Sequence, residues 1–427
     1  MDKCVKVSKK NSSIVLDKDK CDNCGICSSI CSFNVGVYGF SNESFPCINC
    51  GSCTIMCPKK CLNEKDETSV LRDYLHSGKT IIFQVAPAAR VTISEEFGLE
   101  PGINMAGKLV SALRLIGGDY VFDTTFGADL TVMEEASELV DRINKKLKGP
   151  MFTSCCPAWV KFVEMFYPEY LGNLSTCKSP IAMEEAIIRN YFSKVNNIDN
   201  DDIISISIVP CTAKKMERVR FGPDLAITVR ELAKYLKEEH IDIRKLKDSR
   251  FDNLMSTGSG GGLIFGTSGG VTESVMREVY HILNKKKPKG KVLNFKNVRG
   301  LSNIKEANIK IKGYTFRIAV INGTGDARKV LERIKKNEVN YDFIEVMACE
   351  GGCISGGGQP RVYDNTVNLK KKRMNALYNS DKKMKIRYAS DNPDIKRVYK
   401  ELLGSPLSEK AKELLHTTYG GDEFYGR

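Results

Sequence analysis

Cysteines follow three separate apolar segments of this sequence. The first segment leads into Cys155 and Cys156, the second into Cys211, and the third into Cys349 and Cys353. Because neighbouring side chains of an extended chain point to opposite sides, we expect Cys155 and Cys156 to face different chambers. Open α/β sheets place their ligands at the carboxyl ends of the strands. Four thiolates are therefore available to converge: Cys156, Cys211, Cys349 and Cys353. A 4Fe-4S cube needs four such ligands.

A doubled C-x2-C-x2-C-x3-C pattern lies nearer the amino terminus. This pattern is typical of bacterial ferredoxins, in which the fourth cysteine of each copy binds the other cluster. A zinc site needs pairs of cysteines with a longer gap between them, so the pattern favours iron-sulfur clusters. The crossed arrangement assigns one 4Fe-4S cluster to Cys21, Cys24, Cys27 and Cys57, and the second to Cys47, Cys50, Cys53 and Cys31. Cys4 and Cys61 lie outside both copies, and we interpret them as free or buried thiols.

The chain has sixteen cysteines and only four histidines. In a reducing compartment, this many cysteines favour metal binding or redox chemistry over disulfides. No histidine neighbours a cluster of other ligand-type residues, so sulfur dominates the metal chemistry, and iron-sulfur centres are favoured over a histidine-bound metal. The sequence contains no apolar run long enough for a signal peptide or a membrane span. We therefore expect a cytoplasmic protein with no membrane association.

The formal net charge of this 427-residue chain is +13. A basic chain raises the possibility of nucleic-acid binding, but the lysines are spread along the sequence. The densest runs, residues 285–289 and 370–373, lack interleaved aromatic residues. Such runs are typical of solvated faces, and docking of an acidic protein partner is the alternative. We expect no nucleic-acid partner.

Alternating strands and helices must position the second group of cysteines. Residues 81–86 form a nearly continuous apolar run, which is typical of a strand buried on both faces of a parallel sheet. The alternation predicts an α/β domain of two mostly parallel-sheet lobes around a buried cluster. Strands are predicted at 120–123, 204–209, 314–322 and 343–347, and helices near 107–115, 134–142, 160–170, 181–192, 229–239 and 271–283.

The length favours two or three domains. We expect an N-terminal α+β ferredoxin-like domain with two 4Fe-4S clusters at residues 1–78. The main α/β domain is predicted at residues 79–375, and a C-terminal helical segment packed on it at residues 376–427. A glycine-rich stretch at 258–270 matches neither G-x-G-x-x-G nor the phosphate-loop pattern. Close approach of the backbone to a bulky inorganic group explains so many glycines better.

Three segments that contain these cysteines, residues 153–159, 210–217 and 345–360, resemble the signature motifs of the iron-only (FeFe) hydrogenases. With the ferredoxin-like repeat and the C-terminal helices, the resemblance covers nearly the whole chain. It implies reversible oxidation of H2 at an H-cluster, a 4Fe-4S cube joined through one cysteine sulfur to a two-iron unit with CO, cyanide and azadithiolate. By position, it implies that Cys156, Cys211 and Cys349 ligate the cube, and that Cys353 also bridges to the two-iron unit.

The resemblance implies further roles around the H-cluster. Cys155 resembles the family's proton donor to the bridging amine, and the ordinary thiol pKa of roughly 8.5 suits proton exchange near neutral pH. Lys214 would offer a buried cation to a cyanide, with Glu217 as its expected support. The family's proton path maps onto Glu135, Ser175, Glu138 and Arg142. Without the resemblance, the carboxylates would be interpreted as a solvated helix face, since positions 135, 138 and 142 share one side of a helix.

The pocket for the two-iron unit shows both matches and departures. The positions that line it in the family are Ala86, Pro87, Ser179, Phe265 and Met347. Val209 stands where methionine is usual, and Ile181 stands where glutamine is common, so a packing contact and a hydrogen bond are altered. The reaction type is retained, because Cys155 and all four cluster ligands are present. Cys177, which matches no ligand position, is interpreted as structural.

Two other functions fit the same scaffold: a hydrogen or redox sensor, and a non-catalytic iron-sulfur assembly factor. Sensors of this kind tend to lose the proton-donor cysteine or to carry an added signalling domain, and the presence of both Cys155 and Lys214 argues against an assembly factor. The hydrogenase interpretation implies H2 and protons as substrates. It also implies a ferredoxin or similar acidic electron carrier attracted by the positive surface. Maturation proteins must supply the two-iron unit, since only Cys353 tethers it.

Overall fold

A four-stranded parallel sheet forms the centre of one lobe in the computed structural model, which describes residues 3–289, 296–361 and 366–420. Its strands lie in the order β4 (Tyr120–Asp123), β3 (Thr80–Val85), β6 (Ile203–Val209) and β7 (Leu225–Thr228), and all neighbours are parallel. Every residue of β6 is buried, and so is all of β3 after its first residue. Helices therefore cover both faces of this sheet, as the apolar runs predicted.

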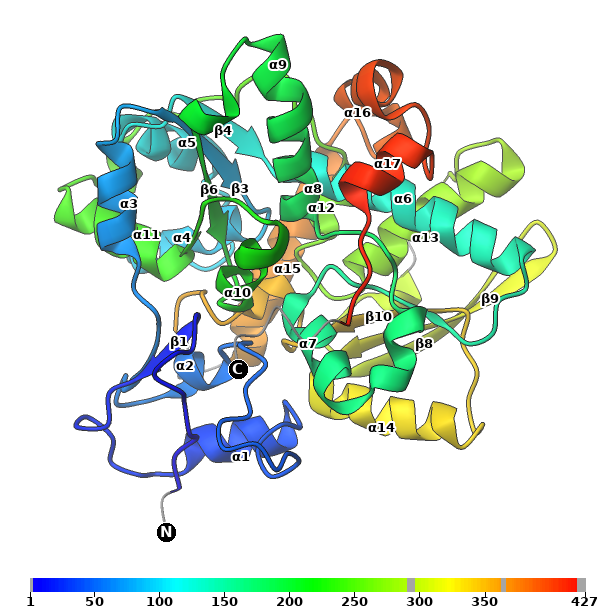
Figure 1. Ribbon diagram of the computed structural model, residues 1–427, viewed down its shortest axis with the longest axis horizontal. Coiled ribbons are helices and arrows are strands. Elements are labelled where there is room, and N and C mark those ends of the chain that lie inside the picture. The colour runs from blue at the N-terminus through cyan, green and yellow to red at the C-terminus, as the bar shows by residue number, and fades with distance from the viewer. Residues whose placement is uncertain (1–2, 290–295, 362–365, 421–427) are drawn as a thin grey trace.

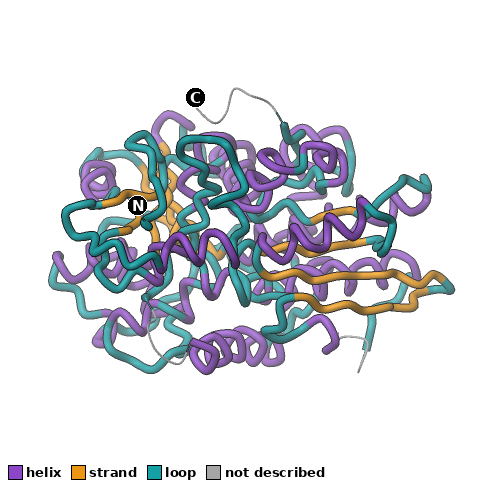
Figure 2. The backbone as a smooth tube through the Cα atoms, turned by 90° about the horizontal axis from the view of Figure 1, so that it is seen from below, coloured by secondary structure: helices purple, strands orange, loops and turns teal. Residues whose placement is uncertain are grey.

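A second four-stranded sheet forms the other lobe. Its order is β5 (Met151–Phe152), β10 (Phe343–Met347), β9 (Tyr314–Asn322) and β8 (Ile304–Ile311). β10 runs parallel to β5 and β9, whereas β8 is an antiparallel edge strand. Burial along β8 largely alternates between its two faces, as expected for a strand with one solvated side. In Figures 1 and 2 the two sheets are separate groups of strands surrounded by helices.

The N-terminal region is a small unit at the lower left of Figure 1, below the lobe that contains β3 and β6. Its only sheet among the described residues pairs β1 (Ile14–Leu16) with β2 (Leu62–Glu64) in antiparallel register. Each copy of the cysteine pattern contains one helix, α1 (Ile26–Phe33) or α2 (Ser52–Met56). The residue before each helix is a glycine with a positive φ, 82° at Gly25 and 74° at Gly51. Glycine adopts this conformation without steric cost, so both turns next to the cysteines are favoured.

The long helix α6 (Thr125–Asn144) crosses the main domain and packs against α8, α12 and α13. Among the described residues, no helix combines the length and the apolar character that a membrane span requires. The remaining helices are α3 (Thr68–Leu75), α4 (Ile93–Glu96), α5 (Ala106–Leu115), α7 (Pro157–Phe166), α8 (Pro180–Ile187), α9 (Ser193–Val195), α10 (Ala213–Phe221), α11 (Val229–Glu238), α12 (Gly260–Ile264), α13 (Gly270–Asn284), α14 (Thr324–Lys335), α15 (Thr366–Lys383), α16 (Pro393–Val398) and α17 (Glu409–Leu415).

The predicted α/β class is confirmed, and the strands at 120–123, 314–322 and 343–347 have the predicted bounds. The sequence analysis did not predict β7, β8 or α14. The boundary predicted between residues 375 and 376 falls inside α15, so the C-terminal helices begin at Thr366. Residues 421–427 of the predicted C-terminal segment lie outside the described residues.

The glycines of the stretch 258–270 are crowded by protein, which corrects the expected inorganic neighbour. A Cβ atom on Gly260 would lie 2.0 Å from Asp381 Oδ1, and one on Gly270 would lie 1.8 Å from the carbonyl oxygen of Ile264. A Cβ atom on Gly262 would lie 2.5 Å from the carbonyl oxygen of Thr125. These glycines therefore allow α12 to pack closely against α6, α15 and the start of α13.

Candidate active site

Both sheets deliver cysteines at the carboxyl ends of their strands. Cys211 lies between the end of β6 and the start of α10, and Cys156 lies between β5 and α7. Cys349 follows β10, and Cys353 opens a 3-10 turn. The turn between the last two cysteines contains Gly351 and Gly352, whose φ angles are 87° and 88°. Residues other than glycine rarely adopt this left-handed backbone conformation, so the turn favours glycine at both positions.

The thiols of Cys156, Cys211, Cys349 and Cys353 lie close enough to act on one another electrostatically. Burial raises the pKa of Cys211, and the neighbouring Cys156 and Cys353 raise it further. Burial raises the pKa of Cys353 to about 12, again with a contribution from Cys156. The pKa of Cys349 is raised by burial first and then by Cys211 and other thiols. Four thiolates so close together would repel one another. A bound metal deprotonates coordinating thiols and offsets the repulsion between their charges, so the donor set fits a sulfur-ligated cube.

Cys155 lies beside this group and is 9% exposed. Burial raises the pKa of its thiol well above the usual range, and Glu135, Cys156 and Cys353 add to the rise, while Lys214 opposes it. The ordinary thiol pKa that the sequence analysis assumed is therefore not retained. A buried thiol next to a carboxylate holds its proton more firmly than an exposed one.

Lys214 points into the same region from the first turn of α10, and its side chain is 12% exposed. Its Nζ lies 2.6 Å from Glu217 Oε2 and 3.4 Å from the carbonyl oxygen of Cys155, and the Ser179 hydroxyl donates to Glu217 at 3.0 Å. Burial alone would lower the pKa of Lys214, but the Glu217 carboxylate raises it above its ordinary value. The lysine therefore remains a cation, supported by Glu217 as expected.

The carboxylates of α6 are buried, so they do not form a solvated helix face. Glu135 is 0% exposed, and neither of its carboxylate oxygens has a hydrogen-bond partner among the described residues. The Ser175 hydroxyl donates to Glu138 Oε2 at 2.8 Å, and the Thr176 amide donates to the same carboxylate. Arg142, partly exposed near the end of α6, donates to the carbonyl oxygen of Gly172 at 3.5 Å. Exposure thus rises from the fully buried Glu135 and Ser175 through Glu138 to the partly exposed Arg142.

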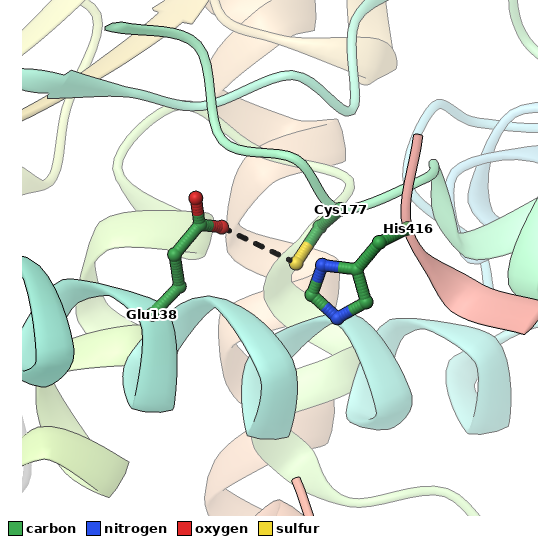
Figure 3. Close-up of side chains that lie close together, drawn as sticks. All are labelled: Glu138, Cys177 and His416. Carbon is green, nitrogen blue, oxygen red and sulfur yellow. Dashed lines mark hydrogen bonds between the residues drawn. The ribbon is translucent and has the colours of Figure 1, made fainter. Parts of the chain in front are cut away.

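A second set of ligand-type side chains adjoins this route: Glu138, Cys177 and His416 (Figure 3). Their ligand atoms lie within 4.8 Å of one another. However, both ring nitrogens of His416 are engaged, Nε2 with Glu134 Oε2 at 2.9 Å and Nδ1 with Thr176 Oγ1 at 2.7 Å. These hydrogen bonds hold the residue after α17, His416, against α6. We keep the interpretation of Cys177 as a structural residue.

The predicted pocket residues are buried, as are the two departures. Phe265 and Met347 share one apolar cluster with Cys155. Ala86 and Pro87 are buried directly after β3, and Ser179 is buried directly before α8. Ile181 and Val209 pack together with Ala226 in a small apolar cluster of their own. Two apolar side chains that contact each other therefore replace the polar and thioether groups usual in the family.

The N-terminal cysteines form two adjoining neighbourhoods. Cys53 has its pKa raised well above normal by burial and then by Cys50, Cys47 and Cys31. Cys50 also acts on Cys349, so this neighbourhood adjoins the four-cysteine group. Cys27 and Cys57 are buried in an apolar cluster with Cys4 and Cys61. Cys31, Cys47 and Cys53 pack against the same cluster, and Cys24 is exposed.

Glycines bring the second cysteine copy into contact with the loops of the main domain. A Cβ atom on Gly51 would lie 2.8 Å from the Cα atom of Gly357. The Thr54 hydroxyl donates to the Gly357 carbonyl at 2.9 Å, and the Thr212 hydroxyl donates to the Asn49 carbonyl at 2.7 Å. The backbone next to Cys50 is therefore held directly against the segments that carry Cys211 and Cys353.

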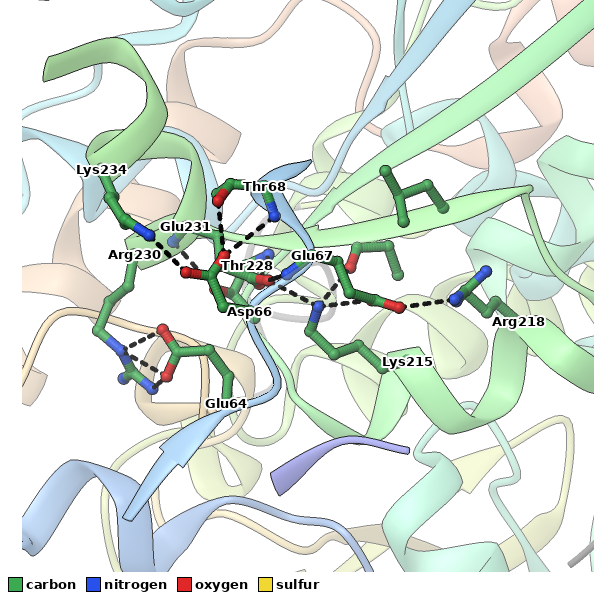
Figure 4. A network of polar contacts seen from close by, with 12 residues as sticks. Glu64, Asp66, Glu67, Thr68, Lys215, Arg218, Thr228, Arg230, Glu231 and Lys234 are labelled. Atoms are coloured by element: carbon green, nitrogen blue, oxygen red, sulfur yellow. Dashed lines mark hydrogen bonds and ion pairs between the residues drawn. The ribbon is translucent and has the colours of Figure 1, made fainter. Parts of the chain in front are cut away.

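The sequence analysis missed a buried charge network that joins the two units (Figure 4). Lys215 Nζ lies 2.8 Å from both Glu67 Oε2 and Glu231 Oε1, and the lysine side chain is 0% exposed. Arg218 pairs with the other oxygen of Glu67, and Arg230 with Glu64. The sequence did contain one indication of this network. Lys215 directly follows Lys214 in a segment expected to be buried, and a buried lysine needs an acidic partner.

The chain matches the family described as "Iron only hydrogenase large subunit, C-terminal domain" over residues 79–357. Residues 367–421 match the family described as "Iron hydrogenase small subunit". It is 38% identical to "Iron hydrogenase 1" of Clostridium pasteurianum, an alignment that covers 98% of this chain and 78% of that protein. The chain therefore belongs to the iron-only hydrogenase family, a family of oxidoreductases.

Other relatives agree with this assignment. The chain is 39% identical to "NADP-reducing hydrogenase subunit HndD" of Solidesulfovibrio fructosivorans, covering 96% of this chain and 75% of that one. The solved structure of the apo FeFe-hydrogenase HydA1 from Chlamydomonas reinhardtii aligns with a TM-score of 0.71 at 39% identity, covering 80% of this chain and 94% of that chain. "Protein NAR1" of Arabidopsis thaliana is also similar, at a lower identity of 26% over 86% of this chain and 82% of that protein.

Proposed function

We propose that this protein interconverts H2 with protons and electrons at an H-cluster held by Cys156, Cys211, Cys349 and Cys353. The observation that carries the proposal is the convergence of four thiols from two lobes beside a fifth, buried thiol at Cys155. When bound, the H-cluster supplies the metal site at which H2 is made or cleaved. Membership of the hydrogenase family supports the same assignment.

The protein's own part in the reaction is to move protons through a dry interior. Cys155 holds a proton next to the cluster ligands, and Glu135 acts on it electrostatically. The Glu135 carboxyl group lies near enough to both Cys155 and Ser175 to act on the pKa of the one and to be acted on by the other, so we assign it the position between them. Ser175 is already hydrogen-bonded to Glu138, and Arg142 lies at the outer end. Positioned acids and bases of this kind contribute about 10²- to 10⁴-fold to a rate.

Lys214 and the apolar pocket hold the two-iron unit in this proposal. A buried ammonium group, kept charged by Glu217, is a strong donor to an anionic cyanide nitrogen. Phe265 and Met347 exclude water around Cys155. The other residues assigned to the pocket wall are Ala86, Pro87 and Ser179. Since Cys353 alone tethers the unit, maturation proteins must supply it.

In this proposal the N-terminal domain, residues 1–78, would hold two clusters that carry electrons to and from the cube of the catalytic domain, which runs from residue 79 to the start of α15, with the C-terminal helices packed on it. We assign the inner 4Fe-4S cluster to Cys31, Cys47, Cys50 and Cys53, and the outer one to Cys21, Cys24, Cys27 and Cys57. The electrostatic contact of Cys50 with Cys349 supports the inner position, and the exposure of Cys24 supports the outer one. The proposed carrier is a ferredoxin or similar acidic protein, in the cytoplasm, where thiols stay reduced.

Infrared spectroscopy of the matured protein, together with hydrogen turnover driven by reduced viologen, tests this proposal. We expect absorption bands of metal-bound CO and cyanide and measurable turnover. Both should be lost in Cys353→Ser, because the only tether of the two-iron unit is removed. An assembly factor would show neither bands nor turnover, and a sensor would show bands with little turnover; each result would contradict the proposal.

A further inference from the structure

Two cysteines that match no ligand position lie against sulfurs assigned to the outer cluster. Cys4 Sγ lies 3.5 Å from Cys27 Sγ, and Cys61 Sγ lies 3.2 Å from Cys57 Sγ, and both Cys4 and Cys61 also interact with Cys21. Cys4 and Cys61 are only 4% and 3% exposed. The two contacts come from different parts of the chain, since Cys4 precedes the first cysteine copy and Cys61 follows the second. The ligand sulfurs are thus approached from two sides.

Sulfur atoms in direct contact cannot both bind iron in one cube, because each ligand occupies a separate corner. The ferredoxin spacing selects Cys27 and Cys57 as ligands. It leaves Cys4 and Cys61 next to the ligand sulfurs but off the iron. Both thiols are packed in one apolar cluster that also contains Val5.

A neutral thiol that touches a metal-bound thiolate can act only as the hydrogen-bond donor of the pair. The cluster gains negative charge when it is reduced, so donors to its sulfurs stabilise the reduced form more than the oxidised form. Hydrogen bonds to the sulfurs are among the factors that set the potentials of iron-sulfur clusters. The backbone amide of Val5 already donates to Cys27 Sγ at 3.4 Å, which adds a further donor on the same sulfur.

We propose that Cys4 and Cys61 donate S–H···S hydrogen bonds to Cys27 and Cys57 and thereby raise the reduction potential of the outer cluster. This inference rests on the proposed function, because it requires the outer cluster to be present. Its consequence is that electrons are held preferentially at the exposed end of the relay, where Cys24 lies at the surface. Cys4 and Cys61 are therefore positioning residues for the electron relay and not ligands.

Redox titration of the matured full-length protein, followed by electron paramagnetic resonance, tests the inference. The signal of the outer cluster is identified as the one that is lost in Cys24→Ala. We expect Cys4→Ala and Cys61→Ala to keep the iron content but to shift this signal to a more negative midpoint potential. The expected change in the reduced-to-oxidised ratio is about threefold to tenfold, where tenfold corresponds to about 59 mV for a one-electron couple.

Serine and valine variants separate hydrogen bonding from packing. Cys4→Ser and Cys61→Ser keep a donor and should retain or raise the potential. Val7→Ala, which opens space in the same apolar cluster without removing a donor, should leave the potential unchanged. Unchanged potentials in both alanine variants would overturn the inference, and so would loss of one cluster's iron, because the residue would then be a ligand. A wild-type protein without the outer-cluster signal would overturn the proposed relay itself.

Discussion

Glu135 has a fully buried carboxyl group without a hydrogen-bond partner among the described residues. Burial, followed by the charges of Glu138 and Glu345, raises its pKa well above the ordinary value. The folded protein therefore keeps a proton on Glu135 at a pH where the unfolded chain has lost it. Since the unfolded state binds fewer protons in this window, stability falls as pH rises from about 4.5 toward the raised pKa.

Replacing Glu135 by glutamine should therefore stabilise the fold while it impairs turnover. Glu135→Gln removes the ionisable group, so its melting temperature should exceed that of wild type at pH 8 and approach it near pH 4. The difference in unfolding free energy should grow with pH by at most about 1.4 kcal/mol per unit. Calorimetry at several pH values and a viologen assay measure the two effects. A variant with a constant stability difference at all pH values would contradict the raised pKa.

The second prediction at the residue scale concerns Cys155. Cys155→Ala should lower hydrogen turnover by about 100-fold or more, the lower end of the effect of a positioned proton donor. The iron content and the reducibility of the N-terminal clusters should not change, because Cys155 is not a ligand. Full turnover in this variant would refute the proton-donor role and leave the cluster ligands unaffected.

At the scale of elements, one lysine joins the linker before α3 to α10 and α11. Lys215→Met would leave Glu231 buried without its cation and Glu67 paired with Arg218 alone (Figure 4). Breaking a buried charge pair from one side costs about 3–5 kcal/mol, so we expect a loss of this size in denaturant unfolding. Lys234→Met is the matched control, because its pair with Asp66 is about half exposed and should contribute less than about 1 kcal/mol.

A triple variant separates the charge effect from the packing effect in this network. Adding Glu67→Gln and Glu231→Gln to Lys215→Met removes both carboxylates that faced the lysine, of which Glu67 also pairs with Arg218, and should recover part of the lost stability. If the triple variant were less stable than Lys215→Met alone, the uncompensated charges would not be the cause of the loss.

The central strands and the order of the cysteines were predictable, because buried parallel strands are continuous apolar runs and cysteine spacing is explicit in the sequence. Strand β8 was not, since its sequence contains charged residues on a solvated face. The partners of Lys215 could not be predicted either, because they are distant in sequence. Likewise, Ile181 and Val209 are separate departures in the sequence, whereas the fold places them in one apolar cluster.

At the scale of the whole molecule, the net charge of +13 determines how a protein carrier is expected to meet the N-terminal domain. Steering of an acidic carrier by a positive surface weakens with ionic strength, because the Debye length falls from about 10 Å at 0.1 M to about 3 Å at 1 M. Turnover coupled to an acidic ferredoxin should therefore fall several-fold over this range. Turnover with a small cationic viologen should not fall. A carrier-coupled rate that is independent of salt would contradict docking by charge.

The central claim is that sulfurs from both lobes and from the N-terminal domain arrange iron in one line from surface to core. Anomalous X-ray diffraction at the iron absorption edge of the matured protein tests it most directly. We expect three separate iron sites, one of them enclosed by Cys156, Cys211, Cys349 and Cys353 with additional iron density beyond Cys353. Iron at the N-terminal cysteines alone, with the four interior thiols unbound, would contradict the account.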